Sequence, residues 1–492
     1  MKKEDYRLKK LLKKFVNIYA YIPDVQLDWK KTVPKLWFMP PATRPAKKQA
    51  AHYFLLAAAI NETKVIGNAR NVRVLLCCLH EKLHERFFTI QDPSEFEDEV
   101  TSCQSTCKLF GQFGPKKVKI ANILASVNRF VNNKAKGDLI KYAKDLSTNG
   151  GKPQDMVEKL AYSMGAMGGR HRGKSWLYMR WMVRDKPDLR LFKSFKPRDL
   201  LVPLTTPTLR VAVALKLVDE EVVEALQSAE RIEDWWQHDH EEQKGARIAL
   251  TDYAKTLFRN DPARVDHAFF VLGRWLSSFD LNKEVLIQSL EFFNKKYDEI
   301  RTPPIKYLVV FPHEYRSGIG ASGSVERCVA EMLNKKRIRF EYEPIEFRLP
   351  KINSGPPTYK PDLILPKRIG EKKVFLEPHG NYENIKQQLT KWSLFRETYG
   401  EYCFLIVIAP DGLVKLIHEI PNEKEAYDCL WKISDFSKEL DRLLKGEESP
   451  KTHGARYMKA LNCQLVLEIT RVNGLQRIKV VLGDNCGVAL AW

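Results

Sequence analysis

Apolar residues spaced three and four positions apart recur through the first 300 residues, and this spacing is typical of amphipathic helices. Glycine and proline interrupt the pattern at residues 149–153, 196–197, 202–203 and 260–262. We therefore predict that residues 1–300 are α-helical. Two clear examples of the spacing are Leu139, Tyr142, Ala143 and Leu146, and then Met156, Leu160, Ala161 and Met164.

A different pattern begins after the proline pair in Arg301-Thr-Pro-Pro-Ile305, which interrupts the last helix and marks a domain joint. Short apolar runs at 306–311 and 403–408 are typical of buried strands. Between them we predict a helix from about Ser324, strands at 361–365 and 374–377, and a helix at 383–399. Residues 305–415 thus form an α/β domain.

The last part of the chain, residues 416–492, is predicted to add a helix and a hairpin. The helix is expected at 426–444. The hairpin strands are 464–470 and 476–482, which flank Asn473-Gly474, a strong two-residue turn signal. The predicted fold is therefore multidomain: an all-α half, an α/β domain and a small extension.

Charge narrows the possible partners. The chain has 492 residues and a formal net charge of +20, which favours a polyanionic partner, DNA first. A solubility charge or ribosome association is the alternative interpretation. No run of 18 apolar residues, no secretory leader and nine dispersed cysteines lead us to expect a cytoplasmic, nucleoid-associated protein without a membrane partner. The oligomeric state stays open.

Three acidic residues of the α/β domain fall where a metal-dependent nuclease would need them. Glu326 lies on the opening turn of the first predicted helix, Asp362 starts one strand and Glu377 ends the next. Carboxylates can hold Mg²⁺ or Mn²⁺, which polarises a phosphodiester and activates a water. We therefore expect a site with one of these metals.

The stretch 324–408, including Tyr359-Lys-Pro-Asp362 and Val374-Phe-Leu-Glu377, resembles the PD-(D/E)xK nuclease superfamily of restriction-endonuclease-like folds. The resemblance implies that Asp362 and Glu377 are metal ligands and that Glu326 is accessory. The lysine expected two residues after Glu377 is replaced by His379. His379, or Lys386 on the following helix, would then supply its function; a degenerate fold kept for binding is the alternative.

A glycine-rich basic stretch lies at 164–184. From Arg170 to Arg198 there are ten Lys and Arg against two Asp, so the segment is a candidate to contact a phosphate backbone. Aromatic residues interleave with these charges and either stack on bases or pack in the core. The predicted DNA-binding residues are Arg170, Arg172, Lys174, Arg180 and Arg184.

Residues 120–280 resemble the helix-hairpin-helix DNA glycosylase superfamily, near the archaeal 8-oxoguanine glycosylases. The matching residues include Lys174 after the glycine-rich hairpin and Leu201-Val-Pro-Leu204. The resemblance implies that Lys174 is a nucleophile, whereas Thr205 occupies the position of the assisting aspartate. Three hypotheses remain: a metal-dependent DNA endonuclease in repair or processing, a glycosylase or abasic-site lyase using Lys174, and a catalytically inactive DNA-binding protein.

Overall fold

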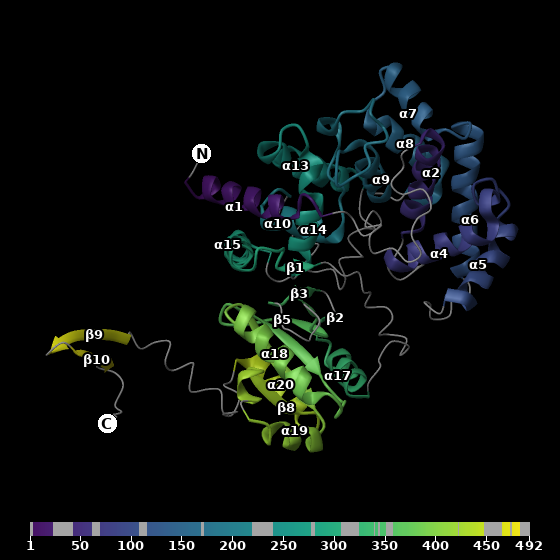
Figure 1. The fold of residues 1–492 in the computed structure, drawn as a ribbon. Helices are drawn as coiled ribbons and strands as arrows, with labels where there is room; N and C mark the ends of the chain where they lie inside the picture. Colours follow the sequence, from purple (N-terminus) through teal and green to yellow (C-terminus); the bar gives the residue numbers. More distant parts are fainter. Residues whose placement is uncertain are drawn as a thin grey trace. The chain divides into compact units, whose positions relative to one another are not determined.

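The computed structural model describes most of the chain (Figure 1). The described residues are 3–22, 43–61, 69–107, 116–168, 172–218, 240–276, 281–306, 324–338, 340–342, 345–350, 358–421, 423–446, 465–472 and 475–482.

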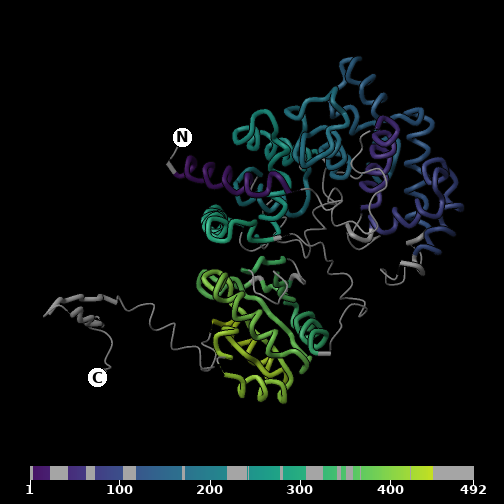
Figure 2. Tube along the Cα trace, in the orientation of Figure 1, coloured from purple at the N-terminus to yellow at the C-terminus, as the bar shows by residue number. Residues whose placement is uncertain are grey.

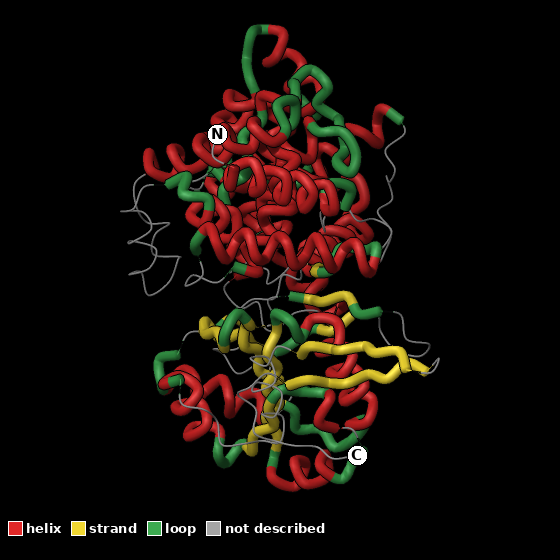
Figure 3. Tube along the Cα trace, turned by 90° about the vertical axis from the view of Figure 1, so that its left-hand side faces the viewer, coloured by secondary structure: helices red, strands yellow, loops and turns green. Residues whose placement is uncertain are grey.

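The chain forms two compact units whose sequences interleave. The first unit comprises residues 1–320 and 341–366, and the second comprises residues 321–340 and 367–492. The first unit is mostly helical, as predicted, and Figure 3 shows its helices in red.

The helices of the first unit follow the predicted periodicity and breaks, and Figure 2 follows the chain through them. The α-helices are α1 (Lys3–Tyr19), α2 (Arg44–Ile60), α4 (Ala69–Leu83), α5 (Pro93–Cys107), α6 (Lys116–Arg129), α7 (Leu139–Thr148), α8 (Pro153–Ser163), α9 (Gly173–Val183), α10 (Thr206–Ala214), α13 (His240–Leu257), α14 (Asp266–Trp275) and α15 (Lys283–Ile300). Shorter turns are η2 (His84–Phe88), η3 (Phe130–Lys134), η4 (Gly165–Met167), η5 (Pro197–Asp199) and η6 (Pro262–Val265).

Helix α2 lies at the centre of the larger helical core. Its residues 50–60 are all buried, as expected for a helix that is apolar on every side. Helix α9 packs on it: the Phe54 and Trp181 rings lie edge to face, 6.1 Å apart, and the Tyr178 hydroxyl donates to the Ala51 carbonyl at 3.0 Å. The basic stretch at 164–184 therefore includes a helix, α9, that is anchored in the core.

A second contact joins α10 to α14. A Cβ atom on Gly273 would lie 1.8 Å from the Pro207 carbonyl oxygen. Only a residue without a side chain allows the two helices to approach this closely.

A small sheet completes the first unit. Its strands are β1 (Ile305–Lys306), β3 (Glu346–Arg348) and β4 (Thr358–Tyr359), in the order β1-β3-β4 and antiparallel. Phe347 is fully buried and lies 6.4 Å from the Trp275 ring, and the Tyr19 hydroxyl donates to the Ile305 carbonyl at 2.9 Å. The strand predicted at 306–311 is described only at its start, and the rest lies outside the described residues.

A mixed five-stranded sheet has the order β2-β5-β6-β7-β8. Strand β6 pairs in parallel with β7, and β7 with β8, so the predicted α/β character is confirmed. Helix α17 contacts β6, helix α18 contacts β7, and helices α19 and α20 contact β8. The strands are β2 (Glu341–Tyr342), β5 (Leu363–Ile369), β6 (Lys372–Pro378), β7 (Cys403–Ala409) and β8 (Cys429–Lys432), and the helices are α17 (Ser324–Lys335), α18 (Ile385–Tyr399), α19 (Asp411–His418) and α20 (Phe436–Lys445).

The single helix predicted at 426–444 is wrong in its first part. The turn η7 (Glu423–Glu425) and strand β8 precede α20, because residues 429–432 pair with β7 at the sheet edge. The predicted hairpin is confirmed: β9 (Leu465–Val472) and β10 (Leu475–Leu482) are antiparallel, with Val472 opposite Leu475.

No described helix has the length and apolar character needed to cross a membrane.

Candidate functional site

Glu377 lies on the face of β6 that packs on α18. Side chains alternate along a strand, so Phe375, Glu377 and His379 point to the same side. The Phe375 ring contacts Phe395 of α18 at 6.0 Å, and the His379 ring contacts Trp392 of α18 at 5.3 Å. Glu377 stands between these two aromatic contacts and is only 8% exposed.

Glu326 approaches the same end of β6 from α17. It lies in the first turn of that helix, as predicted, and is also 8% exposed. A Cβ atom on Gly380 would lie 3.0 Å from Cγ2 of Val325, so the start of α17 touches the chain just after β6. The fold thus brings two nearly buried carboxylates to one end of the strand.

Asp362 directly precedes β5 and is half-buried. Within the ranges that the structure describes, no group of three or more His, Cys, Asp or Glu side chains is placed to hold a metal ion. A preformed cage built from all three predicted acidic ligands is therefore not seen. Mg²⁺ is commonly held by one or two carboxylates together with water and substrate phosphate oxygens.

His379 is the residue that the nuclease resemblance aligned with a lysine, and it does not carry the charge of a lysine. Burial against α18 lowers its pKa below the usual 6.5, and the nearby Lys391 ammonium lowers it further, while a backbone hydrogen bond at Asn381 acts in the opposite direction. The imidazole is therefore neutral near pH 7 and carries no charge to place beside a phosphate. Its Nε2 atom is buried without a hydrogen-bond partner in the described structure.

Two lysines of α18 differ in their relation to this site. Lys386, the predicted alternative, lies in the first turn and is exposed. Lys391 is half-buried, precedes Trp392 and acts electrostatically on His379. Lys391 was not predicted as a site residue, although its helical spacing from Phe395 places it near the face that packs on β6.

The glycine-rich stretch forms the entrance to α9. Arg172 is the residue before the helix and has a left-handed backbone, φ 49°; its guanidinium donates to the Gly168 carbonyl and pairs with Glu158 at 3.4 Å. The Lys174 ammonium donates to the Ala59 carbonyl at 2.9 Å. Arg170 lies outside the described residues.

Arg180 and Arg184 do not form a DNA-binding surface, and that prediction is wrong. Arg180 is 4% exposed and pairs with Asp266 and Asp188. Arg184 is 7% exposed, contacts Asp188 at 2.5 Å and binds Asp261 with two nitrogens at 2.8 and 2.9 Å. Buried arginines with carboxylate partners stabilise the core, since a buried charge is tolerated only when it is paired.

The interleaved aromatic residues are part of the core as well. Trp176, Tyr178 and Trp181 are fully buried. Of the two interpretations of these residues, core packing is therefore correct and stacking on bases is excluded in this conformation.

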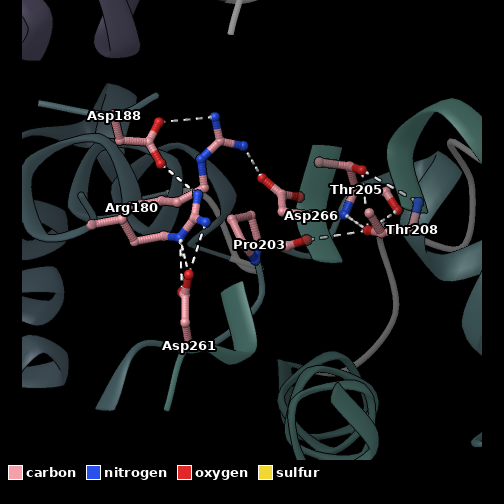
Figure 4. A network of polar contacts seen from close by, with 8 residues as sticks. Arg180, Asp188, Pro203, Thr205, Thr208, Asp261 and Asp266 are labelled. Atoms are coloured by element: carbon pink, nitrogen blue, oxygen red, sulfur yellow. Dashed lines mark hydrogen bonds and ion pairs between the residues drawn. The ribbon is translucent and has the colours of Figure 1, made fainter. Parts of the chain in front are cut away.

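Thr205, which the glycosylase resemblance aligned with an aspartate, has a structural role. It is the N-cap of α10, where its hydroxyl accepts a hydrogen bond from the Thr208 amide and Thr208 Oγ1 accepts one from the Thr205 amide at 2.8 Å (Figure 4). Threonine is a favourable N-cap residue. The described arrangement caps a helix and provides no carboxylate at residue 205.

Comparisons with known proteins give one match. No curated protein and no solved structure matches the chain. Residues 78–274 match a family model described as "Protein of unknown function (DUF2400)"; the matched segment includes α9, α10, α13 and α14, so the helical part of the chain is similar to this family.

Proposed function

We propose that the protein is a DNA endonuclease that hydrolyses phosphodiester bonds with Mg²⁺ or Mn²⁺. The observation that carries this proposal is the pair of nearly buried carboxylates, Glu326 and Glu377, at one end of β6. Carboxylate oxygens are the donors that divalent cations prefer, and a bound cation would compensate two such charges held at one end of a strand.

Glu377 would be the principal metal ligand and Glu326 the accessory one. Their oxygen atoms are the donors that Mg²⁺ and Mn²⁺ prefer. Asp362 belongs to the other compact unit and stays a predicted ligand. The bound metal would supply an activated water and would neutralise charge on the phosphate.

Lys391 would supply the positive charge that the family lysine provides elsewhere. It lies on the helix that packs on the Glu377 face and close enough to His379 to lower the pKa of that imidazole. The neutral His379 would hold its place between β6 and Trp392 and orient water or phosphate by hydrogen bonding.

The helical unit would bring DNA to this centre. The net charge of +20 supports a polyanionic substrate. Arg172 and Lys174, at the start of α9, are the described members of the predicted DNA-binding set that are not buried in ion pairs with the core.

Nicking of supercoiled plasmid tests the proposal. We expect nicking with Mg²⁺ or Mn²⁺ that EDTA abolishes, and a loss of at least about 100-fold in Glu377→Gln. Glu371→Gln, an exposed carboxylate in the turn between β5 and β6, is the matched control and should nick normally.

DNA affinity separates catalysis from binding in the same samples. Glu377→Gln should bind DNA as well as the wild type, or better, because a negative charge is removed from the site. If the pure protein nicks no DNA with either metal while binding it normally, the nuclease proposal fails and a DNA-binding function takes its place.

A further inference from the structure

One arginine of the helical unit is buried without an ion pair. Arg247, on α13, is 3% exposed. Within the described part of the chain, its Nε and Nη2 atoms have no hydrogen-bond partner. A buried guanidinium is favourable only when hydrogen bonds and an anion compensate its charge, so Arg247 can accept a further anionic partner.

The same unit shows how its other buried arginines are treated. Arg180 and Arg184 are equally buried, and both contact aspartates. The core therefore neutralises guanidinium groups where they serve the fold. Arg247 differs from them, which indicates that its partner is a ligand.

Two charged side chains act on Arg247 in opposite directions. Burial lowers the pKa of Arg247 to about 10, Glu158 raises it and Arg172 lowers it, so the group stays protonated at neutral pH. The carboxylate of this set, Glu158, already pairs with Arg172 at 3.4 Å. Two guanidinium groups thus share one exposed glutamate.

Two further features point to an anion. Arg172 immediately precedes α9, and the start of an eleven-residue helix presents backbone N–H groups and the positive end of the helix dipole. Tyr162, one turn after Glu158 on α8, is 96% exposed. An exposed tyrosine is a surface on which a base can stack.

We propose that Arg247 and Arg172 form a phosphate-binding site at the start of α9, where a phosphate group enters beside Tyr162 and becomes the missing partner of Arg247. A guanidinium can bind phosphate oxygens through two parallel N–H groups. The phosphate belongs either to a nucleic-acid backbone or to a free phosphate compound. The site does not depend on the carboxylates of β6 or on any cleavage activity.

Inorganic phosphate is the first probe. At constant ionic strength, phosphate in place of chloride should raise the Tm of the wild-type protein. Arg247→Gln should remove this increase while leaving the Tm without phosphate equal or higher, because a buried unpaired charge is lost. Arg259→Gln, an exposed arginine after α13, should behave as wild type.

A labelled oligonucleotide and a nucleoside monophosphate distinguish the two sources of phosphate. If the backbone is bound, Arg247→Gln should weaken oligonucleotide binding by about 10- to 100-fold and lower the slope of log affinity against log salt by about 1. If only the monophosphate and inorganic phosphate depend on Arg247, the site takes a free phosphate compound.

The proposal is overturned if phosphate and oligonucleotide act on Arg247→Gln as they do on the wild type, or if neither probe binds the wild type. Should Arg247→Gln fail to fold, Arg247→Lys decides: it keeps the charge, but without the planar fork it should bind both probes more weakly. Unchanged binding by folded Arg247→Lys would likewise contradict the proposal.

Discussion

Lys174 tests the glycosylase resemblance at the level of a single residue. Its ammonium donates a hydrogen bond to the Ala59 carbonyl, and Thr205, which the resemblance aligned with an aspartate, caps α10. A lysine that attacks C1′ forms a Schiff base, which borohydride traps as a covalent adduct. We expect no trapped adduct on abasic-site DNA, because the assisting carboxylate is missing. An adduct that Lys174→Ala abolishes would instead establish lyase chemistry.

Lys391 makes a second residue-level prediction. If it supplies the catalytic cation, Lys391→Ala should reduce plasmid nicking by about 100-fold at unchanged DNA affinity. The exposed Lys386 belongs to the same helix, and Lys386→Ala should cost about twofold or less. A larger loss in Lys386→Ala than in Lys391→Ala would assign the role to Lys386.

Sequence patterns could not separate the arginines of the basic stretch. Arg172 and Arg184 look alike in the sequence, yet one pairs with an exposed glutamate and the other is buried between two aspartates. The partner Asp261 comes from a segment 77 residues away. The local excess of positive charge therefore predicted a basic surface on the protein, but not which of the basic side chains lie on that surface.

The contact between α10 and α14 gives a prediction at the level of elements. Gly273→Ala would place a methyl group against the Pro207 backbone. Because the clash is with backbone atoms, α10 or α14 would have to move to remove it. We expect a loss of about 3 kcal/mol or more in unfolding free energy, measured by urea denaturation.

Gly245 is the matched control. It lies inside α13, and an added Cβ meets nothing within 4 Å. Gly245→Ala should stabilise the protein by about 0.5–1 kcal/mol, because alanine is the better helix former. Equal effects at both glycines would show that helix propensity, rather than the close approach, decides the outcome.

His52 joins three elements and makes the helical unit sensitive to acid. Its Nε2 donates to Asn128 Oδ1 at 2.8 Å, and the Asn128 amide donates to the Phe87 and Ile90 carbonyls. Burial lowers the pKa of His52 to about 4, although the Asn128 hydrogen bond acts in the opposite direction. The folded protein therefore binds this proton less readily than the unfolded chain does.

The sign of this effect follows from the lowered pKa. Neutral, buried His52 contributes fully to the free energy of unfolding above pH 6.5. This contribution is lost as the pH falls from 6.5 toward 4, and the loss is on the order of 3 kcal/mol. Denaturation at several pH values should show this fall, and it should be smaller in His52→Gln. An identical pH dependence in both proteins would contradict the assignment.

Helices and strands could be predicted from the sequence where a single spacing of apolar residues runs through the whole segment. Helices α7 and α8 and the buried strand β7 follow their apolar patterns closely. Strand β8 was missed because Cys429-Leu-Trp431 merges with the apolar positions of α20. Its extended form is stabilised by pairing with β7, whose residues 406–409 lie opposite it, and no local pattern encodes that partner.

At the scale of the whole molecule, the charge of +20 predicts how DNA binding responds to salt. Affinity should fall steeply as salt rises, since each bound phosphate releases counterions. Arg172→Ala and Lys174→Ala together should weaken binding to all sequences alike and reduce the salt slope by about 1 for each phosphate that is no longer bound. Salt-insensitive binding, or a double variant with wild-type affinity, would exclude this surface.

The interleaved sequence of the two compact units also limits how the gene can be divided. The chain leaves the first unit after residue 320, returns at 341 and leaves again after 366. A stop codon at the proline pair would remove β3, whose Phe347 packs on Trp275 of the helical unit. A single recombination event therefore cannot transfer either unit intact, and we expect the two to be inherited together rather than shuffled as separate modules.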